Sequence, residues 1–191
     1  KEFHFTPVQL GLIFSAFSWT YLAFQIPGGI LVNRFSPRIL YACSLISWSL
    51  ATMFQGFARG FVTLFGLRMA TGAFEAPAFP INNRVVSSWF PDHERASAIA
   101  VDTSGQFRGL AFLMPVLSWI QFHVGWKGLF IVTGLIGVVW GVIWYIAYRD
   151  PLQHRRANQA ELDLIRQGGG LLDHRPTAAD TEIKKVFNWA D

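Results

Sequence analysis

The sequence predicts an all-α membrane protein. Hydrophobic residues make up 52% of the 191 residues and charged residues only 15%, whereas soluble globular domains contain about 25% charged residues. The mean hydropathy of +0.32 arises from a series of apolar segments, each close to the roughly 20 residues that a membrane-spanning helix needs. Membrane strands are excluded, because they are only about 9–11 residues long and alternate in polarity.

Five apolar segments are expected to cross the membrane as helices, at residues 8–32, 39–58, 61–80, 96–122 and 128–148. Three of them contain no charged residue. The third contains Arg68 and Glu75, and the fourth contains Asp102 and Arg108. Because ionisable side chains at membrane depth face protein or water rather than lipid, we expect these two segments, together with the polar stripe around Tyr21 in the first, to line a cavity.

The connections between the segments differ in charge. One side of the membrane is expected to hold Arg34, Arg38, Arg84, Arg95 and the polar tail, and the other side Lys1, Arg59 and Lys127. Since cytoplasmic loops are rich in Lys and Arg, the chain starts outside and the tail is cytoplasmic. We expect one further helix upstream.

The tail, residues 150–191, is expected to be a cytoplasmic linker toward a second membrane half. Within it, AELDLIRQGGG predicts a short amphipathic helix that the three glycines end.

Arg68 and Glu75 are seven residues apart and therefore share one face of a helix, two turns apart. A carboxylate whose cationic partner comes and goes can take up and release a proton near neutral pH, as a proton-driven transporter requires. Glu75 is therefore the best candidate for proton coupling. The competing interpretation is a permanent ion pair that only holds helices together. Pro77 and Pro80 are expected to kink or end this segment.

The fourth segment contains two polar groups that point in different directions. Asp102 and Gln106 are four residues apart and share a face, while Arg108 points about 160° away from Gln106. For Gln106, a substrate contact and a hydrogen bond between helices are both open. For Arg108 we favour a structural ion pair or snorkelling toward the membrane surface.

Other function classes find little support. The net charge of +4 is scattered over the segment ends, which fits membrane topology better than a nucleic-acid surface. Cys43 is the single cysteine, so neither an intrachain disulfide nor a cysteine metal site is expected. A membrane enzyme would need a nucleophile with a base, or metal ligands, at matching depth, whereas the five histidines lie at segment ends or in loops. We expect no metal, no cofactor and no nucleic acid.

Several strings of this sequence resemble the major facilitator superfamily, and within it the anion:cation symporter family, which includes bacterial D-galactonate and other sugar-acid:proton symporters. These strings are FSWTYLAFQIPGG, GLRMATGAFEAPAFP, NNRVVSSWFPDHERASA, TSGQF and ELDLIRQGGG. The resemblance implies helices two to six of a twelve-helix fold, hence part of its N-terminal six-helix half. It also implies proton-coupled symport of a hexonate, hexuronate or hexarate by a monomer in the inner membrane. The alternative is a truncated fragment that transports nothing.

The resemblance also implies residue roles. Glu75 matches the proton-coupling carboxylate, and Arg68 matches an arginine that partners charged groups in the cavity and binds substrate. Tyr21 and Gln106 match positions that contact the sugar acid. The cytoplasmic gating motif of the superfamily is matched by Gly29, Asn33, Arg34 and Arg38.

This chain departs from the family pattern at several positions. Asn33 stands where the motif usually has an acidic residue, and Ser36 where it usually has glycine. The intramembrane charges Asp102 and Arg108 stand where uncharged residues are expected.

Overall fold

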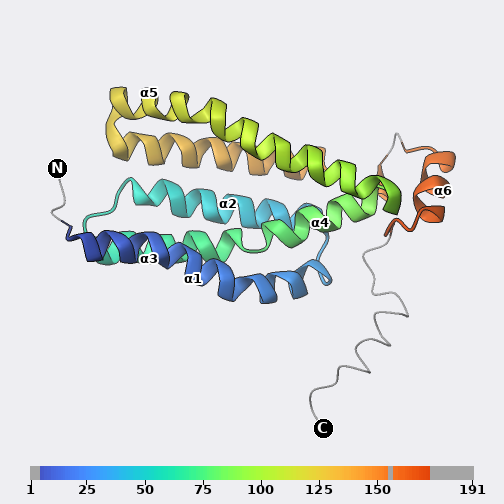
Figure 1. Ribbon diagram of the computed structural model, residues 1–191, viewed down its shortest axis with the longest axis horizontal. Helices are drawn as coiled ribbons and strands as arrows, with labels where there is room; N and C mark the ends of the chain where they lie inside the picture. The colour runs from blue at the N-terminus through green and yellow to red at the C-terminus, as the bar shows by residue number, and fades with distance from the viewer. Residues whose placement is uncertain (1–4, 155–156, 173–191) are drawn as a thin grey trace, which may run out of the picture.

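The computed structural model describes residues 5–154 and 157–172, which form a bundle of long helices with a small helix at one end (Figure 1). The helices are α1 (Pro7–Val32), α2 (Pro37–Gln55), α3 (Phe61–Glu75), α4 (Ala78–Trp89), α5 (Asp92–Ala147), the 3-10 turn η1 (Pro151–Gln153) and α6 (Gln159–Gln167). The described residues contain no strand, so the all-α class predicted from the sequence is confirmed for them.

The start of α1 is fixed by a reciprocal cap. The backbone N–H of Gln9 donates to Thr6 Oγ1 at 3.2 Å, and the Thr6 N–H donates to Gln9 Oε1 at 2.9 Å. Pro7 occupies the first helical position, where a missing N–H costs nothing. Together these contacts satisfy backbone donors that a helix start leaves open, and α1 begins within one residue of the expected segment.

The expected segment 61–80 consists of two helices, which meet at Ala76 and Pro77. Pro77 cannot donate a backbone hydrogen bond and crowds the preceding turn, so α3 ends at Glu75. Pro80 does not interrupt α4, because it lies in the first turn of that helix, where backbone N–H groups have no intrahelical partner. The helical rod then continues to Trp89, beyond the expected end. Residues 82–88 are mostly polar, which ends the apolar segment but not the helix.

Helix α5 contains two of the expected segments. Its 56 residues would measure about 84 Å if straight, far more than a bilayer. The chain instead reverses at Gly125, whose φ of 71° and ψ of 178° are open to glycine. The two limbs lie side by side and antiparallel (Figure 1). We call residues 92–124 the first limb and residues 126–147 the second limb.

Packing within the bundle is uneven. The largest interfaces join α2 to α5, α1 to α3 and α2 to α3. Large apolar side chains point outward, among them Phe122 at 86% and Ile26 at 77% exposure, which suits contact with lipid. By length and hydropathy, α1 and α5 each qualify as able to cross a membrane among the described residues.

The contact between α1 and α3 depends on Gly72. A Cβ atom added there would lie 2.3 Å from the Phe17 carbonyl oxygen and 2.4 Å from Thr20 Oγ1. Both neighbours are part of α1, so the helices could accept a side chain only by moving apart. Small residues at such crossings let membrane helices approach closely.

Replacement of Gly72 by alanine is therefore expected to destabilise the bundle by about 1–3 kcal/mol. Thermal unfolding of the detergent-solubilised protein measures the effect. Gly66→Ala is the matched control on the same helix, because a Cβ atom there meets nothing within 4 Å. Equal stability of the two variants would contradict the close contact.

Candidate functional site

Arg68 lies half-buried on α3 and faces a cavity of about 220 Å³. Its guanidinium carbon is 6.0 Å from the centre of the Phe14 ring on α1. The remaining lining residues are Phe5, Leu10, Ile13, Gln55, Leu64, Trp126 and Phe130. The cavity is thus bounded by α1, α2, α3 and the start of the second limb of α5, and Arg68 brings positive charge to a mostly apolar space.

Gln55, which the sequence analysis did not single out, lines the same cavity. It is 1% exposed, and its Nε2 donates to Thr71 Oγ1 at 3.1 Å. Thr71 in turn donates to the Leu67 carbonyl oxygen at 2.8 Å. The Gln55 Oε1 atom is buried without a hydrogen-bond partner in the described structure, which is uncommon for a buried acceptor, and the residue lines the same cavity as Arg68. The signal available in the sequence was one amide near the end of an uncharged segment.

Glu75 is the last residue of α3 and therefore lies at the break in the α3–α4 rod. It is half-buried. The charges of Arg68 and Glu75 act on each other, yet no ion pair joins them among the described residues. The permanent ion pair considered from the sequence is thus not formed in this structure, and the carboxylate is left for other partners.

Tyr21 lies on α1, the helix that packs directly on α3. Its ring is half-buried and stacks on Phe17, with ring centres 5.5 Å apart. The Phe17 carbonyl is the same group that Gly72 of α3 approaches. The structure therefore brings the helix of Tyr21 against the helix of Arg68 and Glu75, although no hydrogen bond joins these three side chains in the described part of the chain.

The polar residues of the fourth segment lie on the first limb of α5, and all three are exposed. Gln106 Nε2 donates to Asp102 Oδ2 at 3.4 Å, and Arg108 Nε donates to the Ser104 carbonyl oxygen of its own helix at 3.3 Å. Within the described ranges, neither a hydrogen bond nor an ion pair connects them to Arg68 or Glu75. This limb therefore presents a separate polar surface, and in the described parts of the chain no ion pair forms at Arg108.

Tyr41 of α2, which was also not predicted from the sequence, is half-buried. Its side chain hydrogen-bonds Asn82 of α4, and its ring centre lies 4.7 Å from that of Trp144 on α5. Asp102 lines an open groove of about 550 Å³ between α4 and α5, together with Val86, Phe90, Glu94, Ser97, Ala98 and Val101.

The motif in the turn between α1 and α2 contacts the end of α5. Arg38 Nε donates to the Tyr145 carbonyl oxygen at 2.7 Å, and its guanidinium lies 4.3 Å from the centre of the Tyr145 ring. Ser36 caps α2 and donates to Asp150 Oδ2 at 3.1 Å. Asn33 and Arg34 are exposed.

The two adjacent glycines of this motif region differ in their surroundings. A Cβ atom at Gly29 would meet nothing within 4 Å, whereas one at Gly28 would lie 3.0 Å from Pro77 Cα. Gly28 therefore permits the close approach of α1 to the α3–α4 break.

Comparison with known proteins identifies the family. The model of the Major Facilitator Superfamily matches residues 1–188. The chain belongs to the major facilitator superfamily. This major facilitator chain is 52% identical to the D-galactonate transporter of Escherichia coli O6:H1 over 97% of its length, which is 42% of that relative. It is 41% identical to the probable galactarate/D-glucarate transporter of Bacillus subtilis over 93% of its length and 41% of that relative.

The solved structures agree on the fold. A bacterial homologue of the human lysosomal transporter Spinster, inward-facing and unoccupied, matches 77% of this major facilitator chain and 36% of its own chain, with a TM-score of 0.66 and 24% identity. The fold class predicted from the sequence is therefore confirmed, and the protein is a multi-pass membrane protein. The chain spans about two fifths of the length of the curated relatives it matches.

Proposed function

We propose that this chain is part of a secondary transporter that moves a sugar acid together with protons across the inner membrane. The observation that supports the proposal best is the pair of half-buried charges on one broken helix, Arg68 and Glu75, which are not paired with each other. Transporter sites near the bilayer midplane are commonly formed by discontinuous helices. Two of the relatives that this chain resembles are named as transporters of D-galactonate and of galactarate and D-glucarate.

Each residue has a distinct role in this proposal. The Arg68 guanidinium binds the substrate carboxylate, because arginine recognises carboxylates through two parallel hydrogen bonds. Tyr21 and Gln106 contact substrate hydroxyl groups, and Glu75 takes up and releases the coupled proton. Binding of the anion at Arg68 removes the counter-charge that acts on Glu75, which links substrate binding to protonation.

The proposal includes a topology. The five spans are α1, α2, the α3–α4 rod and the two limbs of α5, with the start of the chain outside and the α6 end in the cytoplasm. The positive-inside distribution of Arg34, Arg38, Arg84 and Arg95 supports this orientation. Labelling of single cysteines by an impermeant reagent in spheroplasts tests it. A cysteine at Phe57 or Val124 should react from outside, and one at Gly168 should not.

Uptake measurements on the full-length protein that contains this sequence test the transport function. In proteoliposomes with an inward proton gradient, a radiolabelled hexonate, hexarate or hexuronate should accumulate, and a protonophore should abolish the accumulation. A sodium gradient alone should support none. Uptake that follows sodium, or no uptake of any sugar acid, would contradict the proposal. The isolated 191-residue chain provides the comparison, because the alternative from the sequence is a fragment that transports nothing.

A further inference from the structure

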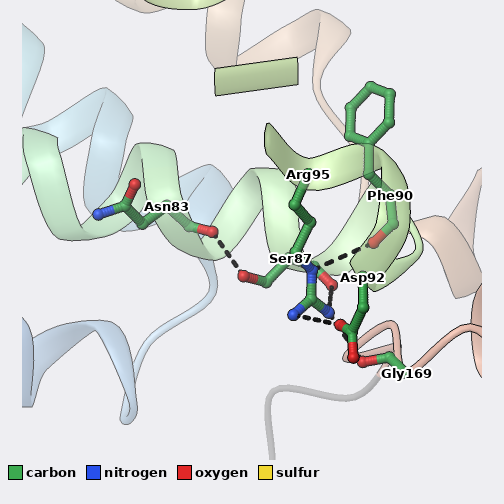
Figure 2. Close-up of polar contacts among 6 residues, drawn as sticks. All are labelled: Asn83, Ser87, Phe90, Asp92, Arg95 and Gly169. Carbon is green, nitrogen blue, oxygen red and sulfur yellow. Dashed lines mark hydrogen bonds and ion pairs between the residues drawn. The ribbon is translucent and has the colours of Figure 1, made fainter. Parts of the chain in front are cut away.

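The end of α6 is attached to the turn between α4 and α5 by a dense set of hydrogen bonds (Figure 2). Arg95, at the start of α5, donates from Nη2 to the carbonyl oxygens of Gly169 at 2.8 Å and Ser87 at 3.3 Å. The same guanidinium pairs with Asp92 and donates from Nε to the Phe90 carbonyl oxygen at 3.3 Å. One side chain thus joins α4, α5 and the tail.

Backbone contacts reinforce this attachment. The Asp92 N–H donates to the Gly168 carbonyl oxygen at 2.7 Å, and the Leu171 N–H donates to the Ser87 carbonyl oxygen at 2.9 Å. Ile165 and Leu172 are buried on either side of these bonds. We call residues 168–172 with Arg95 the clasp.

The clasp requires glycine at one position. Gly169 has a φ of 81°, and a Cβ atom on it would lie 2.5 Å from Asp92 Oδ2. Other L-residues adopt this conformation only at a cost, and the added atom would displace the carboxylate that pairs with Arg95. The glycines therefore do more than end α6: Gly169 lets the backbone after α6 approach Asp92 closely.

The first limb of α5 has few other means of support near its start. Every residue from Ile99 to Arg108 is exposed, and the interface between α4 and α5 is small. Arg95 lies seven residues before Asp102, two turns along the same helix, so it anchors the limb that presents Asp102 and Gln106. Figure 1 shows α6 lying at this end of the bundle, beside the α4–α5 turn.

We propose that Arg95 is a positioning residue, and that the clasp fixes the first limb of α5, which carries the proposed substrate contact Gln106. This inference rests on the proposed transport function and concerns the same site. The clasp stays closed during transport, because its contacts lie within one bundle of helices rather than across moving parts. Loss of the clasp lets the first limb change position. Substrate binding is then weakened through Gln106, although Arg95 itself does not contact the substrate.

The test uses the full-length protein with Cys43→Ser as background. Arg95→Ala should raise the KM for the hexonate about tenfold, the scale of weakening roughly one hydrogen bond between a misplaced Gln106 and the substrate, with kcat changed far less. Arg95→Lys should lie between, since a lysine cannot reach several carbonyl groups at once. Arg166→Ala is the matched control on α6, because that side chain is exposed and, among the described residues, its one ion pair is with Asp163 at 3.8 Å.

A disulfide separates positioning from general stability. Ser87→Cys and Leu171→Cys replace two residues already joined by a backbone hydrogen bond. In the Arg95→Ala protein, oxidation of this pair should restore the KM, and reduction should raise it again. An unchanged KM in Arg95→Ala, or no restoration by the disulfide, would overturn the proposal. So would a disulfide that stops transport in the presence of Arg95, since the clasp would then have to open.

Hydrogen exchange provides a readout independent of transport. In Arg95→Ala, amides of residues 92–108 should exchange faster than in the parent protein, and those of Arg166→Ala should not. If the parent protein transports no sugar acid, the proposed function is wrong. The hydrogen exchange of Arg95→Ala and of the parent protein still decides whether Arg95 holds the first limb. Unchanged exchange in Arg95→Ala would overturn the positioning role by itself.

Discussion

Replacement of Glu75 by glutamine in the full-length protein is expected to abolish proton-driven accumulation of the sugar acid while leaving exchange of internal for external substrate. Glutamine preserves the shape of the side chain and its hydrogen bonding but cannot carry a proton on and off. Glu75 lies at the break in the α3–α4 rod, half-buried and without an ion-pair partner among the described residues, so its protonation is free to change with the occupancy of the cavity. Uptake against a concentration gradient and counterflow, measured on the same proteoliposomes, separate the two activities.

Two carboxylate variants sharpen this test. Glu94→Gln should accumulate normally, because Glu94 is exposed in the first turn of α5, where its Oε1 lies 3.6 Å from His93 Nε2. Asp102→Asn examines the other carboxylate in a predicted span. If Asp102→Asn loses accumulation and Glu75→Gln does not, the coupling group lies on α5, and the assignment of Glu75 is wrong.

The second large effect is expected at Arg68. Arg68→Ala should raise the KM for the sugar acid by at least about thirtyfold. The pair that is lost joins the Arg68 guanidinium to the substrate carboxylate, and truncating one partner of such a desolvated charge pair costs roughly 2 kcal/mol or more. Counterflow should fall along with uphill uptake, in contrast to Glu75→Gln. Arg68→Lys should recover part of the affinity, since it restores the charge but not the two-pronged geometry.

Arg108→Ala is the matched control for Arg68. Both arginines lie in predicted membrane spans, but Arg108 is exposed and its Nε bonds the Ser104 carbonyl oxygen of its own helix. Its removal should change the KM less than about threefold, the scale of a weak exposed interaction. A larger loss for Arg108→Ala than for Arg68→Ala would move the anion site from the cavity beside α3 to the surface of α5.

Gln55 and Tyr41 were not predicted from the sequence, and the physical reason is the same for both. Gln55 and Tyr41 both lie on α2, a segment without charge, and nothing in the linear pattern marks them. Gln55 becomes notable only because α3 places Thr71 against its amide nitrogen, while its oxygen is buried without a hydrogen-bond partner in the described structure and the residue lines the Arg68 cavity. Tyr41 becomes notable only because α2 is packed between α3 and α5, where it hydrogen-bonds Asn82 and contacts Trp144.

The helix boundaries differ from the expected ranges where residues are polar but still helical. Residues 81–89 are too polar for a hydropathy-based span, yet they continue α4, because backbone hydrogen bonding does not depend on side-chain polarity. The expected helix within AELDLIRQGGG is confirmed as α6, since its cap and its glycines are local signals. Its attachment to Arg95 was not predicted, because it joins residues more than seventy positions apart.

The sequence by itself determined the membrane class, the all-α fold, the superfamily and the helix on which Arg68 and Glu75 lie. These follow from hydropathy, spacing and motif identity, which are properties of neighbouring residues. Only the tertiary structure decided that Arg68 and Glu75 are not paired, that Gln55 shares the cavity of Arg68, and that the tail is held by the clasp. Each of these depends on how helices distant in the sequence are packed, because a hydrogen bond or a cavity is set by distances of a few ångströms that the order of residues does not specify.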